Sequence, residues 1–468
     1  MSNLIQLVRR SLDRSSPIHS SRWPTLLRPS SSSAFAGRRF VPSQLDGVED
    51  AEDYQLGGLH PITIGDTFSE GRYRVVHKLG FGSSSTVWLA RDQQHSPWPG
   101  RLVTLKAMRA DSSSVAPEEV PEIAVPKLLQ LDSIPASDFQ TVDDNFLVQG
   151  PNGLHRFLVF PLAGPSILAM SDSPGRVSGS RRLRGDLARS VAKQTATMLC
   201  RMHRAGLVHG DLTTSNILFR VFEDILEWSD DQVYSHLGSP EMEEVRTCNG
   251  QPRGPHAPTE LVAPISASRL TDASLLQEKV VVIDFGQSYA IARRPKNYQP
   301  ATVINYCAPE MRFEGRTGFE TDVWALGCAI FEIRAGFPLF DPLLRSDADV
   351  LRQTVETLGK LPEPWWKSFA EQALWFDEDG EPKSEKDQKL AGALLCSSKS
   401  SIREKLRSIG TQDDSSYLNE GPMIEKSGVR LCEEEIELLG QLLEKMLRYR
   451  PEERIRMPEV VEHPWFTF

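Results

Sequence analysis

A polar stretch at residues 207–217, Leu-Val-His-Gly-Asp-Leu-Thr-Thr-Ser-Asn-Ile, carries residue types that could do chemistry together. His209 and Asp211 stand two positions apart, and Asn216 follows Asp211 by five positions. Phosphoryl transfer needs a carboxylate that takes a hydroxyl proton and oxygen ligands that hold Mg²⁺ on nucleotide phosphates. One short loop with an aspartate and an asparagine can supply both. A plain turn before a buried strand would also account for these residues.

A second acid stands at the end of an apolar run. Residues 280–283, Val-Val-Val-Ile, lead into Asp284-Phe285-Gly286. This order predicts a buried strand that ends in a carboxylate, and a carboxylate oxygen suits a divalent cation. Coming after Asp211 and Asn216, it strengthens the case for a phosphate and magnesium site.

One lysine lies inside the apolar run Leu102-Val103-Thr104-Leu105-Lys106-Ala107-Met108. A buried lysine needs an anionic partner. Residues 117–131 predict a helix in which Glu122 is best placed to meet Lys106, with Glu118 and Glu119 as rivals. An edge-strand lysine that faces water is the alternative interpretation.

A glycine-rich turn follows the alternating residues that begin at Tyr73. Gly80 and Gly82 would let a backbone approach phosphate oxygens, and Val87 would pack on a base. The pattern predicts a strand, a turn and a second strand. An ordinary hairpin would give the same pattern.

Composition and charge bound the class of protein. The chain has 468 residues, of which 40 % are hydrophobic and 25 % charged, so more than one globular lobe is expected. The formal net charge of −10 disfavours a general nucleic-acid binder and permits a basic partner. Six cysteines without close Cys-x-x-Cys spacing indicate neither a disulfide framework nor a zinc site. No apolar run reaches the ~20 residues needed to span a bilayer.

The chain divides by composition. Residues 1–40 contain seven arginines and a single acid, Asp13, which is typical either of a mitochondrial presequence or of a disordered basic, serine-rich tail. Residues 222–278 lose regular periodicity and gain Pro, Gly, Ser and acids, so we expect a surface insertion there. The predicted boundaries are a tail or presequence at 1–45, a lead-in at 46–72, a small lobe at 73–163 and a large lobe at 164–468 that contains the insertion.

Taken in order, these motifs resemble those of a eukaryotic protein kinase, and most closely those of the serine/arginine-protein kinase (SRPK-like) family. Three features carry the narrower resemblance: the lead-in from Glu49 to Asp66, the sequence Ser85-Thr86-Val87-Trp88-Leu89, and the insertion after the Asp211 loop. The resemblance covers residues 65–468. It implies an α+β, two-lobed fold with a small β-rich lobe that holds one key helix and a large helical lobe.

The resemblance also implies roles in the small lobe. The turn that would cover ATP consists of Leu79, Gly80, Phe81, Gly82, Ser83, Ser84, Ser85, Thr86 and Val87. Lys106 would hold the α- and β-phosphates while paired with Glu122. Phe160 would be the gatekeeper of the adenine pocket. The carbonyl of Pro161 and the N–H of Ala163 would bind adenine.

The roles implied in the large lobe are Asp211 as catalytic base, Asn216 and Asp284 as magnesium ligands, Asp322 as a brace of the catalytic loop, and Glu310 paired with Arg454. Two residues depart from the family pattern. Gly210 stands where most kinases have an arginine, so no phosphate is needed to neutralise that cation and constitutive activity is expected. Thr213 stands where serine/threonine kinases carry a lysine on the transferred phosphate, and the loss of one such donor costs ~10²–10³ in rate.

Acids are also found where the resembled family docks arginine-rich peptides. Asp349 and Glu356 are seven residues apart, which places both on one face of the helix predicted at 347–358. Phe337 replaces a further acid that the family would have. An ordinary solvated helix face is the open alternative.

These patterns favour a non-specific serine/threonine protein kinase that uses ATP and Mg²⁺ on protein substrates, with Arg/Ser-rich, splicing-factor-like proteins as the expected class. A pseudokinase or scaffold is the first alternative, supported by Gly210 and Thr213. A small-molecule kinase of the aminoglycoside or choline type is the second. Such enzymes typically lack the Ala308-Pro309-Glu310 segment, the helix that begins at Asp322 and the Arg454 partner. We expect a monomer with no nucleic-acid binding and no membrane span, located in the cytoplasm or nucleus unless residues 1–40 direct mitochondrial import.

Overall fold

The structure is a computed structural model that describes residues 37–94, 100–113, 116–131, 139–172, 181–295, 298–342, 346–411 and 421–468. The chain folds as two compact units, each treated by itself below. The first runs to Ile123 and includes Thr141–Gly164 and Arg220–Leu276, and the second comprises Ala124–Gln140, Pro165–Phe219 and Gln277–Phe468. The first is rich in strands and the second is helical, which confirms the α+β class. The presequence interpretation of residues 1–40 falls almost wholly outside the described residues.

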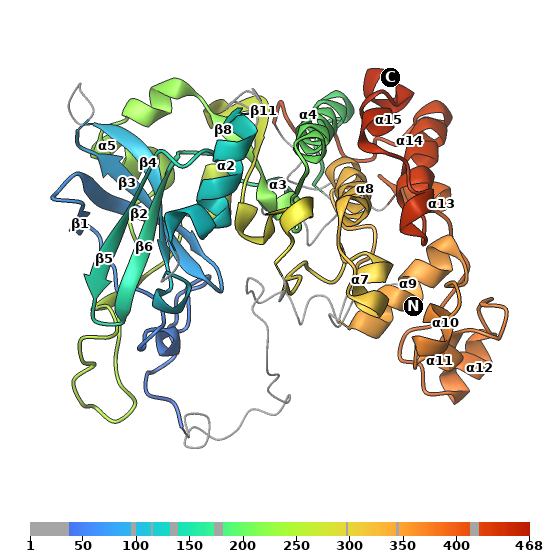
Figure 1. Cartoon of the computed structure of the whole chain (residues 1–468), viewed down its shortest axis with the longest axis horizontal. Coiled ribbons are helices and arrows are strands. Elements are labelled where there is room, and N and C mark those ends of the chain that lie inside the picture. The colour runs from blue at the N-terminus through green and yellow to red at the C-terminus, as the bar shows by residue number, and fades with distance from the viewer. Residues whose placement is uncertain are drawn as a thin grey trace. The chain divides into compact units, whose positions relative to one another are not determined.

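An antiparallel sheet of six strands, ordered β1-β2-β3-β4-β6-β5, forms the body of the first unit (Figure 1). Its strands are β1 (Thr67–Phe68), β2 (Tyr73–Phe81), β3 (Ser85–Asp92), β4 (Arg101–Met108), β5 (Asp144–Gly150) and β6 (Gly153–Pro161). Helix α2 (Pro121–Leu131) follows β4. Residues Met108, Val120, Ile123, Leu158 and Phe160 form a buried cluster that joins α2 to strands β4 and β6.

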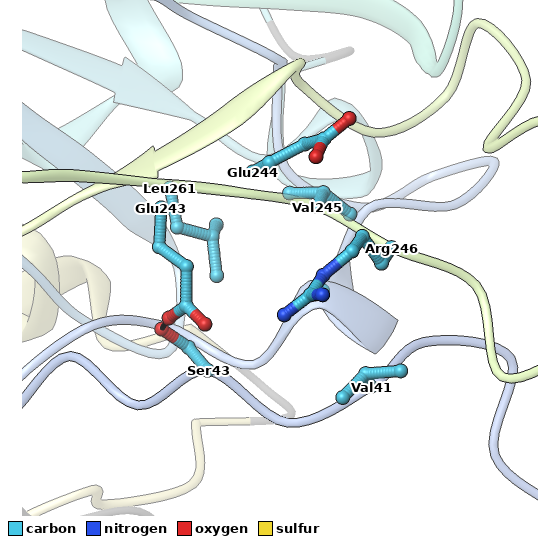
Figure 2. A pocket seen from close by; sticks show the side chains of 8 residues that line it. Val41, Ser43, Glu243, Glu244, Val245, Arg246 and Leu261 are labelled. Atoms are coloured by element: carbon cyan, nitrogen blue, oxygen red, sulfur yellow. Dashed lines mark hydrogen bonds between the residues drawn. The ribbon is translucent and has the colours of Figure 1, made fainter.

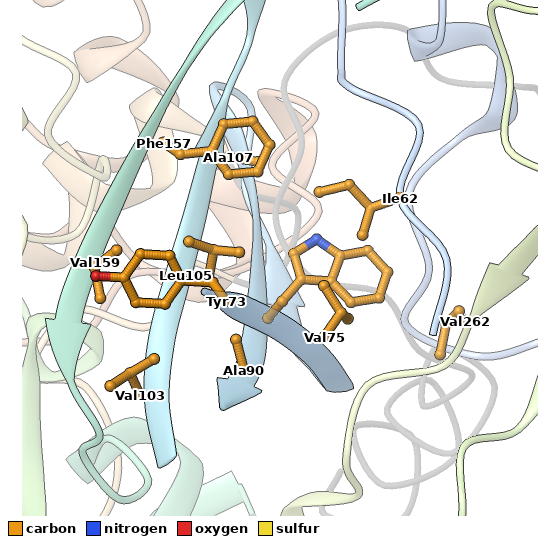
Figure 3. Packing of buried hydrophobic residues seen from close by; sticks show 11 residues of the cluster. Ile62, Tyr73, Val75, Ala90, Val103, Leu105, Ala107, Phe157, Val159 and Val262 are labelled. Carbon is orange, nitrogen blue, oxygen red and sulfur yellow. The ribbon is translucent and has the colours of Figure 1, made fainter. Parts of the chain in front are cut away.

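The core of the sheet is apolar and includes residues from outside the strands. Tyr73, Trp88 and Phe157 are among its large buried side chains. Ile62 from the lead-in and Val262 from the insertion belong to the same cluster (Figure 3). Burial of apolar surface is the main favourable term in folding. Lead-in and insertion therefore contribute to the stability of this unit.

The insertion is structured throughout. Its elements are η6 (Glu223–Glu227), α5 (Asp230–Leu237), β9 (Met242–Glu244), β10 (Glu260–Val262), α6 (Ala267–Leu270) and η7 (Ala273–Leu275). Asp230 at the start of α5 accepts hydrogen bonds from Arg74 (2.7 Å) and from Arg91, whose side chain is 1 % exposed (2.8 Å). Arg91 also donates to the carbonyl of Trp228 at 2.7 Å. These bonds hold the insertion to β2 and β3 and so explain why a segment without periodicity is nevertheless structured.

The lead-in packs on the same unit, and from an earlier residue than the predicted boundary at 46. Phe40 is fully buried and bridges to Thr247, and Glu49 forms a buried ion pair with Lys78 of β2. A small pocket lies between this segment and the β9–β10 hairpin (Figure 2). Val41 and Glu243 are among the side chains that line it.

The second unit is mostly helical. Its helices are α3 (Ile167–Asp172), α4 (Gly185–Arg204), α7 (Pro309–Glu314), α8 (Phe319–Ala335), α9 (Asp347–Leu358), α10 (Trp365–Ser368), α11 (Gln372–Trp375), α12 (Glu385–Leu390), α13 (Ile402–Ser408), α14 (Glu433–Met446) and α15 (Met457–Val461). Helix α8 is buried on almost all sides and packs against α4 and α14, as expected for a helix at the centre of a core. In the described part of the chain, no helix combines the length and apolar character needed to cross a bilayer.

Two short strand pairs set the positions of the predicted catalytic segments. Strand β7 (Leu207–Val208) pairs with β12 (Tyr289–Ala290), and β8 (Ile217–Val221) pairs with β11 (Leu276–Val282). Residues 209–216 connect β7 to β8, while residues 283–288 connect β11 to β12. Because each connection begins and ends at a strand that pairs with a strand flanking the other connection, the two connections lie next to each other.

Candidate active site

Lys106 meets the acid that the sequence favoured as its partner. Lys106 lies on β4 and Glu122 in the first turn of α2, with 3.4 Å between Nζ and Oε1. Their side chains are only 14 % and 8 % exposed. The attraction between these two charges is stronger than in an exposed ion pair, because less water screens it. The nearby Phe160 is 5 % exposed and packs in the cluster under α2.

The glycine-rich turn is a tight connection between β2 and β3. The N–H of Gly82 donates to the carbonyl of Ser85 at 2.8 Å. A Cβ atom placed on Gly80 or Gly82 would meet no heavy atom of the described residues within 4 Å. Neither glycine is therefore required by the packing of the folded chain. Open space above both positions is what a nucleotide phosphate would need.

The expected hinge follows β6, which ends at Pro161. Leu162, Ala163 and Gly164 line an apolar pocket, together with Leu79 of β2 and Trp228 of the insertion. The insertion therefore covers apolar side chains beside the hinge, a contact that the sequence did not predict.

Asp211 and Asn216 lie together on the loop after β7. Asn216 Nδ2 donates to the backbone carbonyl of Asp211 at 2.8 Å and approaches Asp211 Oδ2 at 3.4 Å. Asp211 Oδ1 is buried and has no hydrogen-bond partner among the described residues. Burial, followed by the nearby charge of Asp284, raises the pKa of Asp211 to about 7. A carboxylate with an unused acceptor and a raised pKa suits a general base.

His209 orients the backbone next to the base. Its Nδ1 accepts the N–H of Asp211 at 3.3 Å, so Nε2 carries the proton and donates to the carbonyl of Ile283 at 3.2 Å. Burial lowers the pKa of His209 and keeps the ring neutral. The ring thus links the catalytic loop to the residue before Asp284.

Asp322 at the start of α8 holds the same loop from the other side. Its carboxylate accepts the N–H of His209 at 2.8 Å and the N–H of Gly210 at 2.9 Å. His203 Nε2 lies 3.0 Å from Asp322 Oδ2. Charge-assisted bonds to two successive amides fix the backbone just before Asp211.

Asp284 is brought beside Asn216 by the end of the β8–β11 pair. The N–H of Ile283 donates to the carbonyl of Asn216 at 3.0 Å. Asp284 itself has φ +63° and ψ +71°, the left-handed region that non-glycine residues rarely occupy. Strained backbone of this kind persists where the surrounding structure enforces it, and such places are often functional sites.

The donor set fits a magnesium ion. An asparagine amide oxygen and a carboxylate are hard oxygen ligands, and Mg²⁺ in proteins typically takes one or two of these and fills its other positions with water and substrate phosphates. On the same loop, Asp211 Oδ1 has no hydrogen-bond partner among the described residues and can still accept a hydrogen bond. Asn216 and Asp284 are therefore the residues that would hold the ion.

The two departures from the family pattern are also visible. Gly210 has φ +82°, which glycine adopts without strain. Thr213 is 2 % exposed, and its Oγ1 lies 2.6 Å from Ser215 Oγ.

A buried ion pair lies elsewhere in the second unit. Arg454 binds Glu310 through both terminal nitrogens, at 2.6 and 2.7 Å, and both side chains are almost fully buried. Arg454 also donates to the carbonyls of Glu320 and Arg448 at 2.8 Å. The sequence paired these residues, and the structure brings them into contact.

The two acids expected to dock arginine-rich peptides are paired with an arginine of their own helix. Asp349 and Glu356 do share one face of α9, but Arg352 lies between them. The distance from Arg352 Nη2 to Asp349 Oδ1 is 2.7 Å, and that from Nη1 to Glu356 Oε1 is 2.5 Å. Asp349 is 6 % exposed. Helical spacing (i+3 and i+4) could have shown Arg352 to be their partner, yet the sequence analysis overlooked it.

Sequence reasoning also missed two residues that lie far from the catalytic loop in sequence but contact it in the fold. Tyr306 Oη lies 3.0 Å from Thr214 Oγ1 and also donates to Glu332. Thr302 Oγ1 donates to the carbonyl of Gly210 at 2.9 Å. No periodic signal in the sequence marks either residue.

Comparisons with known proteins agree with this geometry. A family model described as "Protein kinase domain" matches residues 271–466. The serine/threonine-protein kinase SRPK of Physarum polycephalum is 27 % identical over 436 residues, which covers 90 % of this chain and 91 % of the relative. Protein kinase dsk1 of Schizosaccharomyces pombe is 25 % identical over 429 residues and covers 74 % and 76 % of the two chains. SRSF protein kinase 3 of Homo sapiens is 34 % identical over 206 residues, 41 % of this chain and 34 % of that protein. The chain is therefore similar in sequence to protein kinases of the SRPK type.

Proposed function

We propose that this chain transfers the γ-phosphoryl group of ATP to serine or threonine hydroxyls of Arg/Ser-rich proteins. The observation that carries the proposal is the environment of Asp211, a buried carboxylate with one unused oxygen on a loop clamped by Asp322. Asn216 and Asp284, one on each of the two paired connections, complete the set of oxygen groups that the reaction needs.

In the proposed reaction the substrate hydroxyl oxygen bonds to the γ-phosphorus as the bond to ADP breaks. The hydroxyl proton passes to Asp211, whose Oδ1 has the free acceptor capacity to take it. Magnesium held by Asn216 and Asp284 would neutralise the charge that develops on the leaving phosphate. Lys106, kept in place by Glu122, would bind the α- and β-phosphates, and the open backbone at Gly80 and Gly82 would cover them.

Support for basic substrates comes from charge and from relatives. The formal net charge of the chain is −10, which favours encounter with an arginine-rich partner. One relative is named a kinase of SRSF proteins. Because Arg352 binds both Asp349 and Glu356, we place the recognition of arginine elsewhere or expect it to require displacement of Arg352. The cytoplasm or nucleus is the compartment that we propose.

The second candidate is a pseudokinase, favoured by the buried Thr213 where a lysine would contact the transferred phosphate. A magnesium-ATP phosphotransfer assay on residues 37–468 separates the two. It compares an Arg/Ser-repeat peptide with a neutral serine peptide and uses Asp211→Ala as the control. Incorporation that prefers the Arg/Ser peptide and disappears in the control supports the kinase. ATP binding without incorporation, with activity gained in Thr213→Lys, supports the pseudokinase.

A further inference from the structure

Lys78 is a lysine buried inside the first unit, one residue before the glycine-rich turn (residues 79–87). It forms an ion pair with Glu49 of the lead-in, and neither side chain is more than 1 % exposed. The pairing of β2 with β3 shifts register on both sides of Lys78. Irregularities of this kind change the direction in which a side chain points. Here they accompany a charged side chain that lies in the interior instead of in water.

The ammonium group of Lys78 joins the lead-in to both arms of the turn. Its Nζ donates to Glu49 Oε2, and the hydroxyl of Tyr54 donates to Glu49 Oε1. The same Nζ lies 5.8 Å from the ring centroid of Phe81, on the first arm, and 5.4 Å from that of Trp88, which directly follows the turn on β3. A cation near an aromatic face is attracted by the electrons of the ring. One buried charge therefore contacts three separate segments of the first unit.

The partners of Lys78 are themselves held in place. Burial, followed by the charge of Glu49, raises the pKa of Tyr54, so the hydroxyl keeps the proton that it donates to Glu49. The carbonyl of Lys78 accepts the N–H of Ile265, in the insertion, at 3.0 Å. A buried ion pair adds little net stability compared with apolar residues of the same volume, because both charges lose their hydration. Stability alone therefore does not explain this ion pair, whereas its directional bonds fix the place where the turn begins.

We propose that Lys78 is a positioning residue for ATP, and that Glu49 and Tyr54 of the lead-in act through it to hold the glycine-rich turn in the shape that covers the phosphates. The proposal rests on the kinase function proposed above and gives the lead-in a part in nucleotide binding. A Cβ atom on Gly80 or Gly82 would meet no heavy atom of the described residues within 4 Å, so packing at these positions does not hold the turn. The contacts of its two arms with Lys78 supply a hold.

Three variants of the full chain test this role. Lys78→Met and Glu49→Gln each remove one side of the ion pair, and Tyr54→Phe, the mildest change, removes only a hydroxyl. Arg72→Met is the matched control, because Arg72 binds Asp92 at 2.8 Å at the end of β2 and β3 away from the turn. We expect Kd for magnesium-ATP, measured by calorimetric titration, to rise about three- to tenfold in the first two variants and less in Tyr54→Phe. The control should lower the melting temperature and leave Kd at the wild-type value.

Three further readouts separate positioning from a merely structural role. KM for the peptide at saturating ATP should keep the wild-type value in every variant, because the turn would contact only the nucleotide. The double variant Glu49→Gln/Lys78→Met should raise Kd for ATP no further than the stronger single variant, because both changes break the same bond. Hydrogen exchange of residues 79–88 should accelerate in the test variants and stay unchanged in the control.

The two levels of the proposal fail in different ways. An unchanged Kd for ATP in both Lys78→Met and Glu49→Gln, or an equal rise in Arg72→Met, would overturn the positioning role even if the chain transfers phosphate. If Lys78→Met does not fold, Glu49→Gln and Tyr54→Phe decide the question against the same control. A chain that binds ATP with the expected Kd changes but transfers no phosphoryl group would keep the positioning role and reject the kinase function. A chain that binds no ATP would overturn both.

Discussion

The guanidinium of Arg454 and the carboxylate of Glu310 face each other in a buried ion pair, with Nη1–Oε1 and Nη2–Oε2 distances of 2.6 and 2.7 Å. Glu310 lies in the first turn of α7, and Arg454 directly follows the short helix η10 (Pro451–Glu453). The pair therefore anchors the start of α7 to the core of the second unit. Removal of one partner leaves a buried charge without compensation.

We expect Arg454→Met to destabilise the chain by about 3–5 kcal/mol, because Glu310 loses its partner and several carbonyls lose a donor. The double variant Glu310→Gln/Arg454→Met should lose less than the two single variants combined, since no lone charge remains. Thermal unfolding followed by circular dichroism measures both. Arg407→Met removes an exposed pair with Glu433 and should leave the melting temperature unchanged. If Arg407→Met lowered the melting temperature as much as Arg454→Met, the buried pair would not contribute more to stability than the exposed one.

Asp211 should make the chain less stable as pH rises. Its pKa is about 7 in the folded chain against 3.8 in the reference state, so the folded chain prefers the protonated carboxyl. This cost is absent below pH ~4 and fully developed above pH ~7, where it reaches at most about 4 kcal/mol. Asp211→Asn cannot ionise, so its melting temperature should exceed that of the wild type at pH 7.5 and match it near pH 4. The scans are made in EDTA without nucleotide. If the melting temperatures of the wild type and of Asp211→Asn change with pH in the same way between pH 4 and 7.5, burial does not raise the pKa of Asp211.

Gly80 and Gly82 should tolerate alanine structurally but not functionally. A Cβ at either position meets nothing in the folded chain, so the melting temperature of Gly80→Ala and Gly82→Ala should stay within about 2 °C of the wild type. KM for ATP should rise about tenfold, because a methyl group would separate the backbone from the phosphates. Gly58→Ala is the contrasting variant, since its Cβ would lie 2.1 Å from the carbonyl oxygen of Asp53. It should lower the melting temperature. If KM for ATP does not change in the first two variants, the turn does not bind phosphates.

Arg352 should suppress arginine docking on α9. In Arg352→Gln the acids Asp349 and Glu356 lose the cation that binds both of them, so KM for an Arg/Ser peptide should fall severalfold while KM for a neutral peptide stays constant. The melting temperature should fall as well, because two largely buried acids lose their cationic partner. The triple variant that also carries Asp349→Asn and Glu356→Gln is the control and should regain the wild-type preference. A uniform change on both peptides in Arg352→Gln would end the docking hypothesis.

Much of the secondary structure could be predicted, because it follows from local periodicity. The helix expected at 117–131 is found at Pro121–Leu131, and the one expected at 347–358 has those bounds. The lysine in an apolar strand was predicted to need an acid and lies against Glu122, and the apolar run before Asp284 is a strand. Each of these expectations depends on residues that are neighbours in sequence or on one buried charge that demands a partner.

By itself, therefore, the sequence determined the main strands and helices and the candidate residues Lys106, Asp211, Asn216 and Asp284, while its resemblance to protein kinases implied the α+β class. Only the tertiary structure decided that Arg352 binds the two expected docking acids, that the insertion is part of the first unit, that Asp284 takes a positive φ, and that Thr302 donates a hydrogen bond to the carbonyl of Gly210. Most of these features join residues far apart in the chain. Local periodicity reports which face of an element is buried, whereas such contacts depend on how elements pack, and no short stretch of sequence encodes that.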